Sequence, residues 1–497
     1  MVDADGPLGP LGDMSPDTLR RELHRMADWV ADYRESIAGR RIVPAVNPGD
    51  VTAGLTPSVP EEPDTLAQVL RDLDDVVMPG IVHWGHPAFL GYFGSTSNGP
   101  ALLGEFAAAA LNVSAMTWRT SPAATELETV VLGWIRELIG LPRSFTGVVY
   151  DTASVAVLHA LAAARELAAP SVRAHGITGR ADVGIQRVYA SDQAHSSLEK
   201  AMIVLGLGEG NVVRLPTDEA FRLNVAELRA AVRDDRRRGR HPLAVVATVG
   251  TTSAASVDPV REIADVCAAE RMWLHVDAAY GGAMGVLPEG RHVMEGVALA
   301  DSVVVNPHKW MFVPLDFSAL YTRRPDALRT VFALTPEYLR GDAAVAGEGA
   351  AIDYMDYGIQ LGRRFRALKA WMVLRTFGRS GIAARVREHC RLAVLLAGWV
   401  ASERDFLLAA PPSMGVVCFR CVPAGMPDAD VNRLNMSIVE AVNASGDGYI
   451  THTQLGRRTA IRVGLGNVLT TEHHLASVWA RIVAERNRLL DLPAGSA

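Results

Sequence analysis

Lysine is scarce in this sequence. Lysine and arginine together number 49 of the 497 residues, but only Lys200, Lys309 and Lys369 are lysines. Cysteine is also scarce, with four residues, which suits a reducing compartment such as the cytoplasm. The net charge of −6 gives no excess of basic residues for nucleic acid, and no apolar run reaches the roughly 18 residues that a membrane span needs. We therefore expect a cytoplasmic protein that binds neither nucleic acid nor membranes.

Two of the cysteines, Cys418 and Cys421, have the C-x-x-C spacing of some metal and redox sites. No second pair of cysteines or histidines lies nearby, and the apolar run Gly415-Val416-Val417 comes directly before them. We therefore interpret this segment as part of a strand and expect no metal site.

From about residue 98, apolar β-type runs alternate with helical stretches. This alternation predicts an α/β fold with a largely parallel sheet covered by helices. We expect three parts, namely an N-terminal helical arm at 1–97, a large domain at 98–368 and a smaller C-terminal α+β domain at 369–497. Within the arm, the proline-rich stretch 43–63 has little core of its own, so we expect the arm to wrap a partner subunit.

Lys309 follows a pattern typical of a buried strand. The apolar run 302–305 predicts a core strand, and Asn306-Pro307 ends it, so Lys309 comes at the strand's carboxyl end. Loss of water there would lower the pKa of the amine and make it a nucleophile. A lysine at a strand end can also extend its charged group to the surface, so this segment alone leaves both interpretations open.

Three further segments follow predicted strands. Small and hydroxyl residues at 151–154 open a helix, where they suit a phosphate or simply cap the helix. Asp277 ends an apolar run, where its carboxylate needs a cation such as a protonated pyridine nitrogen or an arginine. His195 can cover a flat ring, donate a proton, or form a structural hydrogen bond.

The carboxyl ends of parallel strands meet at one edge of a sheet, which is where ligands bind in such folds. A ligand with an aldehyde, a pyridine nitrogen and a phosphate would use all four segments. Pyridoxal phosphate has these groups, and the four segments together favour it more than any one of them does.

Over nearly its whole length the sequence resembles the group II pyridoxal-phosphate decarboxylases, most closely the aromatic L-amino acid decarboxylases. The segments that carry the resemblance occur in order along the chain: Arg40-Arg41-Ile42-Val43-Pro44, His83-Trp84, Ser121-Pro122-Ala123, Gly250-Thr251-Thr252, His275-Val276-Asp277-Ala278-Ala279-Tyr280, Asn306-Pro307-His308-Lys309-Trp310 and Leu361-Gly362-Arg363-Arg364-Phe365-Arg366.

This resemblance implies a fold-type I homodimer with its active sites at the subunit interface and pyridoxal 5'-phosphate as cofactor. It implies that Lys309 binds the cofactor covalently, that Asp277 contacts the pyridine nitrogen, and that His195 and Ala279 cover the two ring faces. A loop tyrosine, Tyr338, is implied as a proton donor. The other residues implied to bind the cofactor are Thr152, Ala153, Ser154, Thr252, Asn306 and His308. Those implied to line the substrate pocket are Trp84, Tyr92, Phe93, Ser95, Met116 and Gly362.

The implied reaction is the decarboxylation of an L-amino acid, expected to be aromatic, to the amine and CO2. Met116 stands where animal enzymes have an aromatic pocket wall, which leaves the substrate open, while Gly362 leaves space for a bulky, indole-like side chain. Asp151 replaces a small residue and brings an anion to the expected phosphate.

Three alternatives remain. An aldehyde synthase on the same scaffold would couple decarboxylation to oxidative deamination, but relatives of that type tend to lose the loop tyrosine or the stacking histidine. A transaminase and a non-catalytic scaffold are the others, and the intact Lys309, Asp277, His195 and Tyr338 argue against the scaffold.

Overall fold

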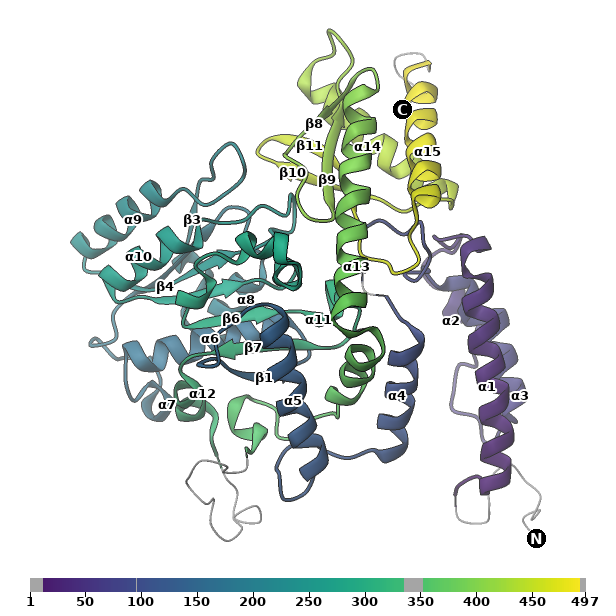
Figure 1. The fold of residues 1–497 in the computed structure, drawn as a ribbon, viewed down its shortest axis with the longest axis horizontal. Coiled ribbons are helices and arrows are strands. Elements are labelled where there is room, and N and C mark those ends of the chain that lie inside the picture. The colour runs from purple at the N-terminus through teal and green to yellow at the C-terminus, as the bar shows by residue number, and fades with distance from the viewer. Residues whose placement is uncertain (1–11, 95, 335–351, 492–497) are drawn as a thin grey trace. The chain divides into compact units, whose positions relative to one another are not determined.

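The computed structural model describes residues 12–94, 96–334 and 352–491 (Figure 1). Contacts divide the chain into two compact units. The terminal unit comprises Met1–Leu90, Ser437–Ile450 and Leu469–Ala497, and the sheet unit comprises Gly91–Met436 and Thr451–Val468. The three-part division expected from the sequence stays a prediction.

The core of the sheet unit is a seven-stranded sheet with the order β1-β7-β6-β5-β4-β2-β3. Its strands are β1 (Thr146–Tyr150), β2 (Gln186–Ser191), β3 (Val212–Leu215), β4 (His241–Thr248), β5 (Trp273–Asp277), β6 (Ser302–Val305) and β7 (Ser318–Thr322). β7 is antiparallel to both of its neighbours, and the pairs from β6 to β3 are parallel. The α/β fold with a mainly parallel sheet is thus confirmed.

Helices enclose this sheet, so its central strands are buried on both faces, and strands of this kind read as continuous apolar runs. α6 (Ala153–Ala168) packs across β1 and β4 to β7, and α10 (Val260–Glu270) packs against β4 and β5. The face of α6 is made largely of alanines, of which Ala156 and Ala163 are fully buried. The other helices of eight or more residues within this unit are α4 (Gly99–Leu111), α5 (Pro122–Leu138), α8 (Ser197–Val204), α9 (Val225–Arg237), α12 (Pro325–Phe332) and α13 (Ala367–Ser402).

A smaller antiparallel sheet follows in the C-terminal part of the sheet unit, as predicted. Its strands are β8 (Phe406–Leu408), β9 (Val416–Cys421), β10 (Thr451–Leu455) and β11 (Arg458–Gly464), in the order β10-β11-β9-β8. Cys418 and Cys421 are buried in β9, which confirms the strand interpretation. The small sheet holds the loop after β4, because Thr453 Oγ1 donates to Ser253 Oγ at 2.9 Å and Cys418 Sγ donates to the carbonyl oxygen of Ser253.

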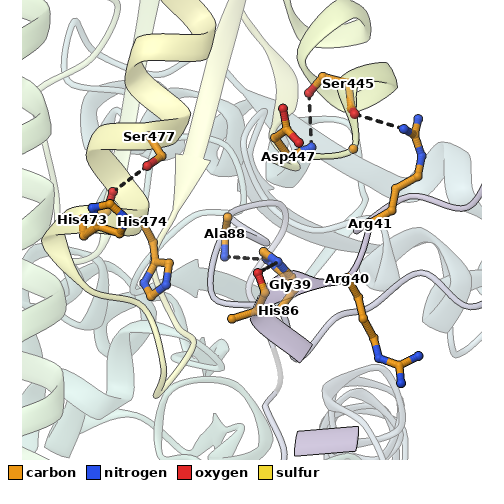
Figure 2. A pocket seen from close by; sticks show the side chains of 12 residues that line it. Gly39, Arg40, Arg41, His86, Ala88, Ser445, Asp447, His473, His474 and Ser477 are labelled. Atoms are coloured by element: carbon orange, nitrogen blue, oxygen red, sulfur yellow. Dashed lines mark hydrogen bonds between the residues drawn. The ribbon is translucent and has the colours of Figure 1, made fainter. Parts of the chain in front are cut away.

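The terminal unit contains α1 (Pro16–Ser36), α2 (Asp50–Gly54), α3 (Leu66–Asp72) and α15 (Glu472–Asp491), and α14 (Asp428–Ser445) ends within it. Arg41 binds the carbonyl oxygens of Ala444 and Ser445, which satisfies two acceptors at the end of α14. Figure 2 shows this contact beside a pocket of about 480 Å³. Arg41 therefore links the segment between α1 and α2 to the end of α14. Among the described residues, no helix is both long and apolar enough to cross a membrane.

Candidate active site

Lys309 lies in a short helix, α11 (Pro307–Trp310), directly after β6. Its Nζ lies 5.1 Å from the centroid of the Phe93 ring. Burial lowers the pKa of the Lys309 amine below its ordinary value; the carboxylate of Asp277 opposes this shift, and the cation of Arg462 adds to it. The sequence predicted this consequence of burial, which increases the fraction of nucleophilic, uncharged amine.

Asp277 ends β5, and its side chain is nearly buried. Its Oδ1 accepts a hydrogen bond from the backbone N–H of Ala279 at 3.0 Å. Asp277 belongs to no ion pair within the described part of the chain, although its charge acts on both Lys309 and His195. A nearly buried carboxylate without an ion-pair partner suits a cationic ligand group such as a protonated pyridine nitrogen.

His195 lies between β2 and α8, on the same side of the sheet unit as this carboxylate and amine. Its Nδ1 accepts the backbone N–H of Ser197 at 3.1 Å, so the neutral ring carries its proton on Nε2. Burial lowers the pKa of His195, with Asp277 opposing the shift and Lys309 adding to it. The ring is therefore neutral at pH 7 and presents a proton donor at Nε2.

The start of α6 has the features of an anion site. Thr152 is the N-cap residue, but its side chain makes no capping bond, and both Thr152 and Ser154 are exposed. A 16-residue helix leaves unpaired N–H groups and a positive dipole end at this point, which suits a phosphate. Asp151 Oδ1 accepts the N–H of Thr152 at 2.7 Å, so one of these donors is already occupied by a carboxylate.

Asn306 and His308, two further residues expected near the phosphate, make structural hydrogen bonds. Asn306 Oδ1 accepts from Ser318 Oγ at 2.7 Å, and His308 Nδ1 accepts from the N–H of Phe317 at 3.0 Å. Burial lowers the pKa of His308 to about 3, so its ring is neutral. These bonds join the segment around Lys309 to the start of β7, because Ser318 is the first residue of β7 and Phe317 directly precedes it.

Three aromatic rings stack on one another beside Lys309. Tyr280 stacks on Phe93 with ring centroids 3.9 Å apart, and on its other side on Trp310 at 4.6 Å. Trp310 Nε1 donates to His389 Nδ1 at 2.9 Å. These contacts fix the ring of Phe93, over which both Lys309 and Arg462 lie.

Arg462, a residue of β11 that is only 3% exposed, was not among the residues predicted from the sequence. Its Nε donates to the carbonyl oxygens of Thr252 and Ser253 at 2.9 and 3.1 Å, and Nη1 donates to that of Tyr92 at 2.7 Å. Among the described residues, Nη2 has no hydrogen-bond partner and the guanidinium has no ion-pair partner. Its position in the apolar run Ala460-Ile461-Arg462-Val463 was the signal in the sequence, because buried arginines are rare unless they are paired.

The remaining expected residues are placed as follows. A Cβ added to Gly362 would meet no atom within 4 Å, so the space there is open, and its part in the substrate pocket stays a prediction. Met116 is half-buried, and Thr252 is exposed with its carbonyl oxygen bound to Arg462. Trp84 lies in the terminal unit, so its part in the pocket stays a prediction. Ser95 and Tyr338 lie outside the described residues.

Comparison with known proteins gives the family. The conserved domain described as "Pyridoxal-dependent decarboxylase conserved domain" matches residues 48–422. The chain belongs to the pyridoxal-dependent decarboxylase family. Its cofactor is therefore pyridoxal phosphate. Three features fit that group: Asp277 without an ion-pair partner among the described residues, Lys309 with its lowered pKa, and the start of α6, which lacks a side-chain cap from Thr152.

Three similar proteins illustrate the range of this decarboxylase family. Tyrosine decarboxylase 4 of Petroselinum crispum is 37% identical, covering 97% of this chain and 96% of its own. Phenylacetaldehyde synthase of Arabidopsis thaliana is also 37% identical, covering 97% of this chain and 98% of its own. The crystal structure of Oryza sativa TDC with PLP and tryptamine is 35% identical, has a TM-score of 0.92, and covers 97% of this chain and 100% of that one.

The electrostatics of the decarboxylase site predict opposite effects of two substitutions on Lys309. Arg462→Met removes a cation that lowers the pKa of Lys309, so this pKa should rise. Asp277→Asn removes an anion that raises it, so it should fall. Only the uncharged amine attacks, so the rate at which the cofactor-free enzyme binds pyridoxal phosphate should rise with pH. The pH of the half-maximal rate should be higher than in the wild type for Arg462→Met and lower for Asp277→Asn. Rapid-mixing absorbance measures this rate, and one unchanged midpoint in all three proteins would contradict the assignment.

Proposed function

We propose that this enzyme decarboxylates an aromatic L-amino acid to the amine and CO2. The observation that carries the proposal is the joint electrostatic environment of three residues: Asp277 and Lys309 both act on the pKa of His195, and Asp277 also acts on that of Lys309. An aromatic substrate is supported by the relatives, which include a tyrosine decarboxylase and a structure containing tryptamine.

Each residue has a distinct part in the proposed reaction. Pyridoxal phosphate, when bound, supplies an electron sink for the electron pair that departing CO2 leaves on the α-carbon. Lys309 would hold the cofactor through its nucleophilic amine. Asp277 would keep the pyridine nitrogen protonated, and the start of α6 at Thr152, Ala153 and Ser154 would hold the phosphate.

We also propose that Arg462 binds the α-carboxylate of the substrate. Its Nη2 is a buried donor without a partner among the described residues, and its guanidinium lies 4.7 Å from the same Phe93 ring over which Lys309 lies. A carboxylate is the anion that each substrate molecule brings in and that leaves as neutral CO2. An unpaired buried cation therefore attracts the substrate but retains no charge partner in the product.

Proton return to the α-carbon needs a general acid. His195 is one candidate, because the Ser197 N–H occupies Nδ1 and leaves the proton on Nε2. Tyr338, implied by the family resemblance, is the other and lies outside the described residues. A positioned general acid contributes on the order of 10²–10⁴ in rate.

An aldehyde synthase remains a second candidate function, because a phenylacetaldehyde synthase is among the relatives at 37% identity. That reaction would consume O2 and release an aldehyde, ammonia and hydrogen peroxide with the CO2. The presence of both His195 and Tyr338 supports simple decarboxylation instead.

A panel of L-amino acids, including tryptophan, tyrosine and phenylalanine, separates these reactions. We expect one amine for each CO2 with at least one aromatic substrate, and no consumption of O2. Aldehyde and peroxide in amounts equal to CO2 would identify the synthase, and no CO2 from any amino acid would contradict both functions.

We infer that the enzyme is a homodimer, because α4 has its large apolar residues on the outside. The small residues Ala101, Gly104 and Ala108 are buried, and a Cβ on Gly104 would lie 2.6 Å from Cα of Lys369 in α13. The large residues Leu103 and Phe106 are 64% and 52% exposed. A second copy of the chain would bury this face.

A cytoplasmic location is supported by the four unpaired cysteines.

Phe106→Glu tests the dimer. A charge at the centre of a buried apolar interface is costly, so this variant should elute as a monomer in size-exclusion chromatography with light scattering. Glu472→Lys, a charge reversal on an exposed residue of the terminal unit, is the control and should elute like the wild type. A Phe106→Glu protein of unchanged mass would show that α4 is not in the interface.

A further inference from the structure

The wall loop, residues 114–118 around Met116, is held by a distant part of the chain. The carbonyl oxygen of Met116 accepts the N–H of Met355 at 3.1 Å. On one side of Met116, the N–H of Ala115 donates to the carbonyl oxygen of Arg363 at 2.8 Å. On the other side, the N–H of Trp118 donates to Oδ1 of Asp353 at 2.8 Å. The segment 353–364, here called the anchor segment, thus fixes the backbone of Met116 itself and on both sides of it.

The anchor segment is in turn fixed to the core of the sheet unit by Arg363. Its Nη2 donates to Glu128 Oε1 at 2.6 Å and to the carbonyl oxygen of Val149 at 2.9 Å, and its Nη1 donates to that of Ala115 at 2.8 Å. The side chains of Arg363 and Glu128 are only 7% and 2% exposed. Because the pair is buried, its removal would disturb folding as well as the wall loop, which makes it a poor probe of function.

Asp353 is the tie that can be removed selectively. It is half-buried at the start of the anchor segment, and its carboxylate oxygen is the acceptor for Trp118, while Ala115 and Met116 are held by backbone bonds and by the side chain of Arg363. Loss of the Asp353 side chain would remove the bond of the anchor segment to Trp118 and leave its bonds to Ala115 and Met116 in place. Trp118 would still be held from α5, because its Nε1 donates to Glu126 Oε1 at 2.8 Å. Asparagine retains an oxygen acceptor at the same position and therefore provides a matched control.

We propose that Asp353 is a positioning residue that fixes the wall loop and thereby sets how strongly the enzyme discriminates between aromatic substrates of different size. The inference rests on the proposed function and on Met116 as a wall of the substrate pocket. A wall distinguishes side chains only when its backbone cannot move away from the larger one, and pocket contacts that differ by one methylene give about 10- to 200-fold discrimination. A wall loop that has lost one of its bonds to the anchor segment should therefore lose part of this discrimination.

The test compares kcat/KM for L-tryptophan and L-phenylalanine in the wild type, Asp353→Ala and Asp353→Asn. In Asp353→Ala the preference for the better substrate should shrink by about threefold to tenfold, a fraction of the range that pocket contacts span, with the change mainly in KM. Asp353→Asn should stay within about twofold of the wild type, because its oxygen can still accept the Trp118 N–H. All three proteins should retain the same visible spectrum of the bound cofactor.

A double substitution separates positioning from general destabilisation. Met116→Ala should by itself reduce the preference, and adding Asp353→Ala to it should have no further effect, because both changes act through the same wall. An unchanged preference in Asp353→Ala, an unchanged preference in Met116→Ala, or effects that simply multiply in the double variant would each overturn the inference. Failure of the proposed function would instead appear in the wild type, which would release no CO2 from tryptophan, tyrosine or phenylalanine.

Discussion

The site depends on buried ionisable groups that have no ion-pair partner among the residues that the structure describes. Lys309 and Arg462 both lie over Phe93, and Asp277 is the carboxylate whose charge acts on Lys309. Separating such groups from water costs several kcal/mol per ion unless partners are supplied. In the proposed reaction, the ring nitrogen of the cofactor would be the partner of Asp277 and the carboxylate of the substrate would be the partner of Arg462. Binding and chemistry therefore follow from the same uncompensated charges.

Two sheets bring these charges together. The parallel sheet delivers Asp277 at the end of β5 and Lys309 directly after β6, whereas the small sheet delivers Arg462 from β11. The side chain of Arg462 is held in place by hydrogen bonds to the carbonyl oxygens of Thr252 and Ser253, in the loop after β4. The small sheet thus contributes Arg462 to the site, and it also contacts the loop after β4 of the large sheet.

The sequence predicted those features of the site that follow from short runs of neighbouring residues. The apolar runs before Asp277 and Lys309 are buried strands, and the burial of Lys309 lowers its pKa, as expected. Arg462 was missed because its burial results from strand pairing and from a loop far away in sequence. For the same reason, the sequence did not indicate the antiparallel placement of β7 or the bonds of Asp353 to the wall loop, which depend on where distant segments meet.

The scarcity of lysine makes the central claim directly testable. Borohydride reduction of the cofactor-loaded enzyme fixes the pyridoxyl group to the lysine that holds it, and mass spectrometry of the digested protein then locates it among Lys200, Lys309 and Lys369. The account predicts that the group is found on Lys309 alone. A pyridoxyl group on Lys200 or Lys369, with Lys309 unmodified, would contradict it.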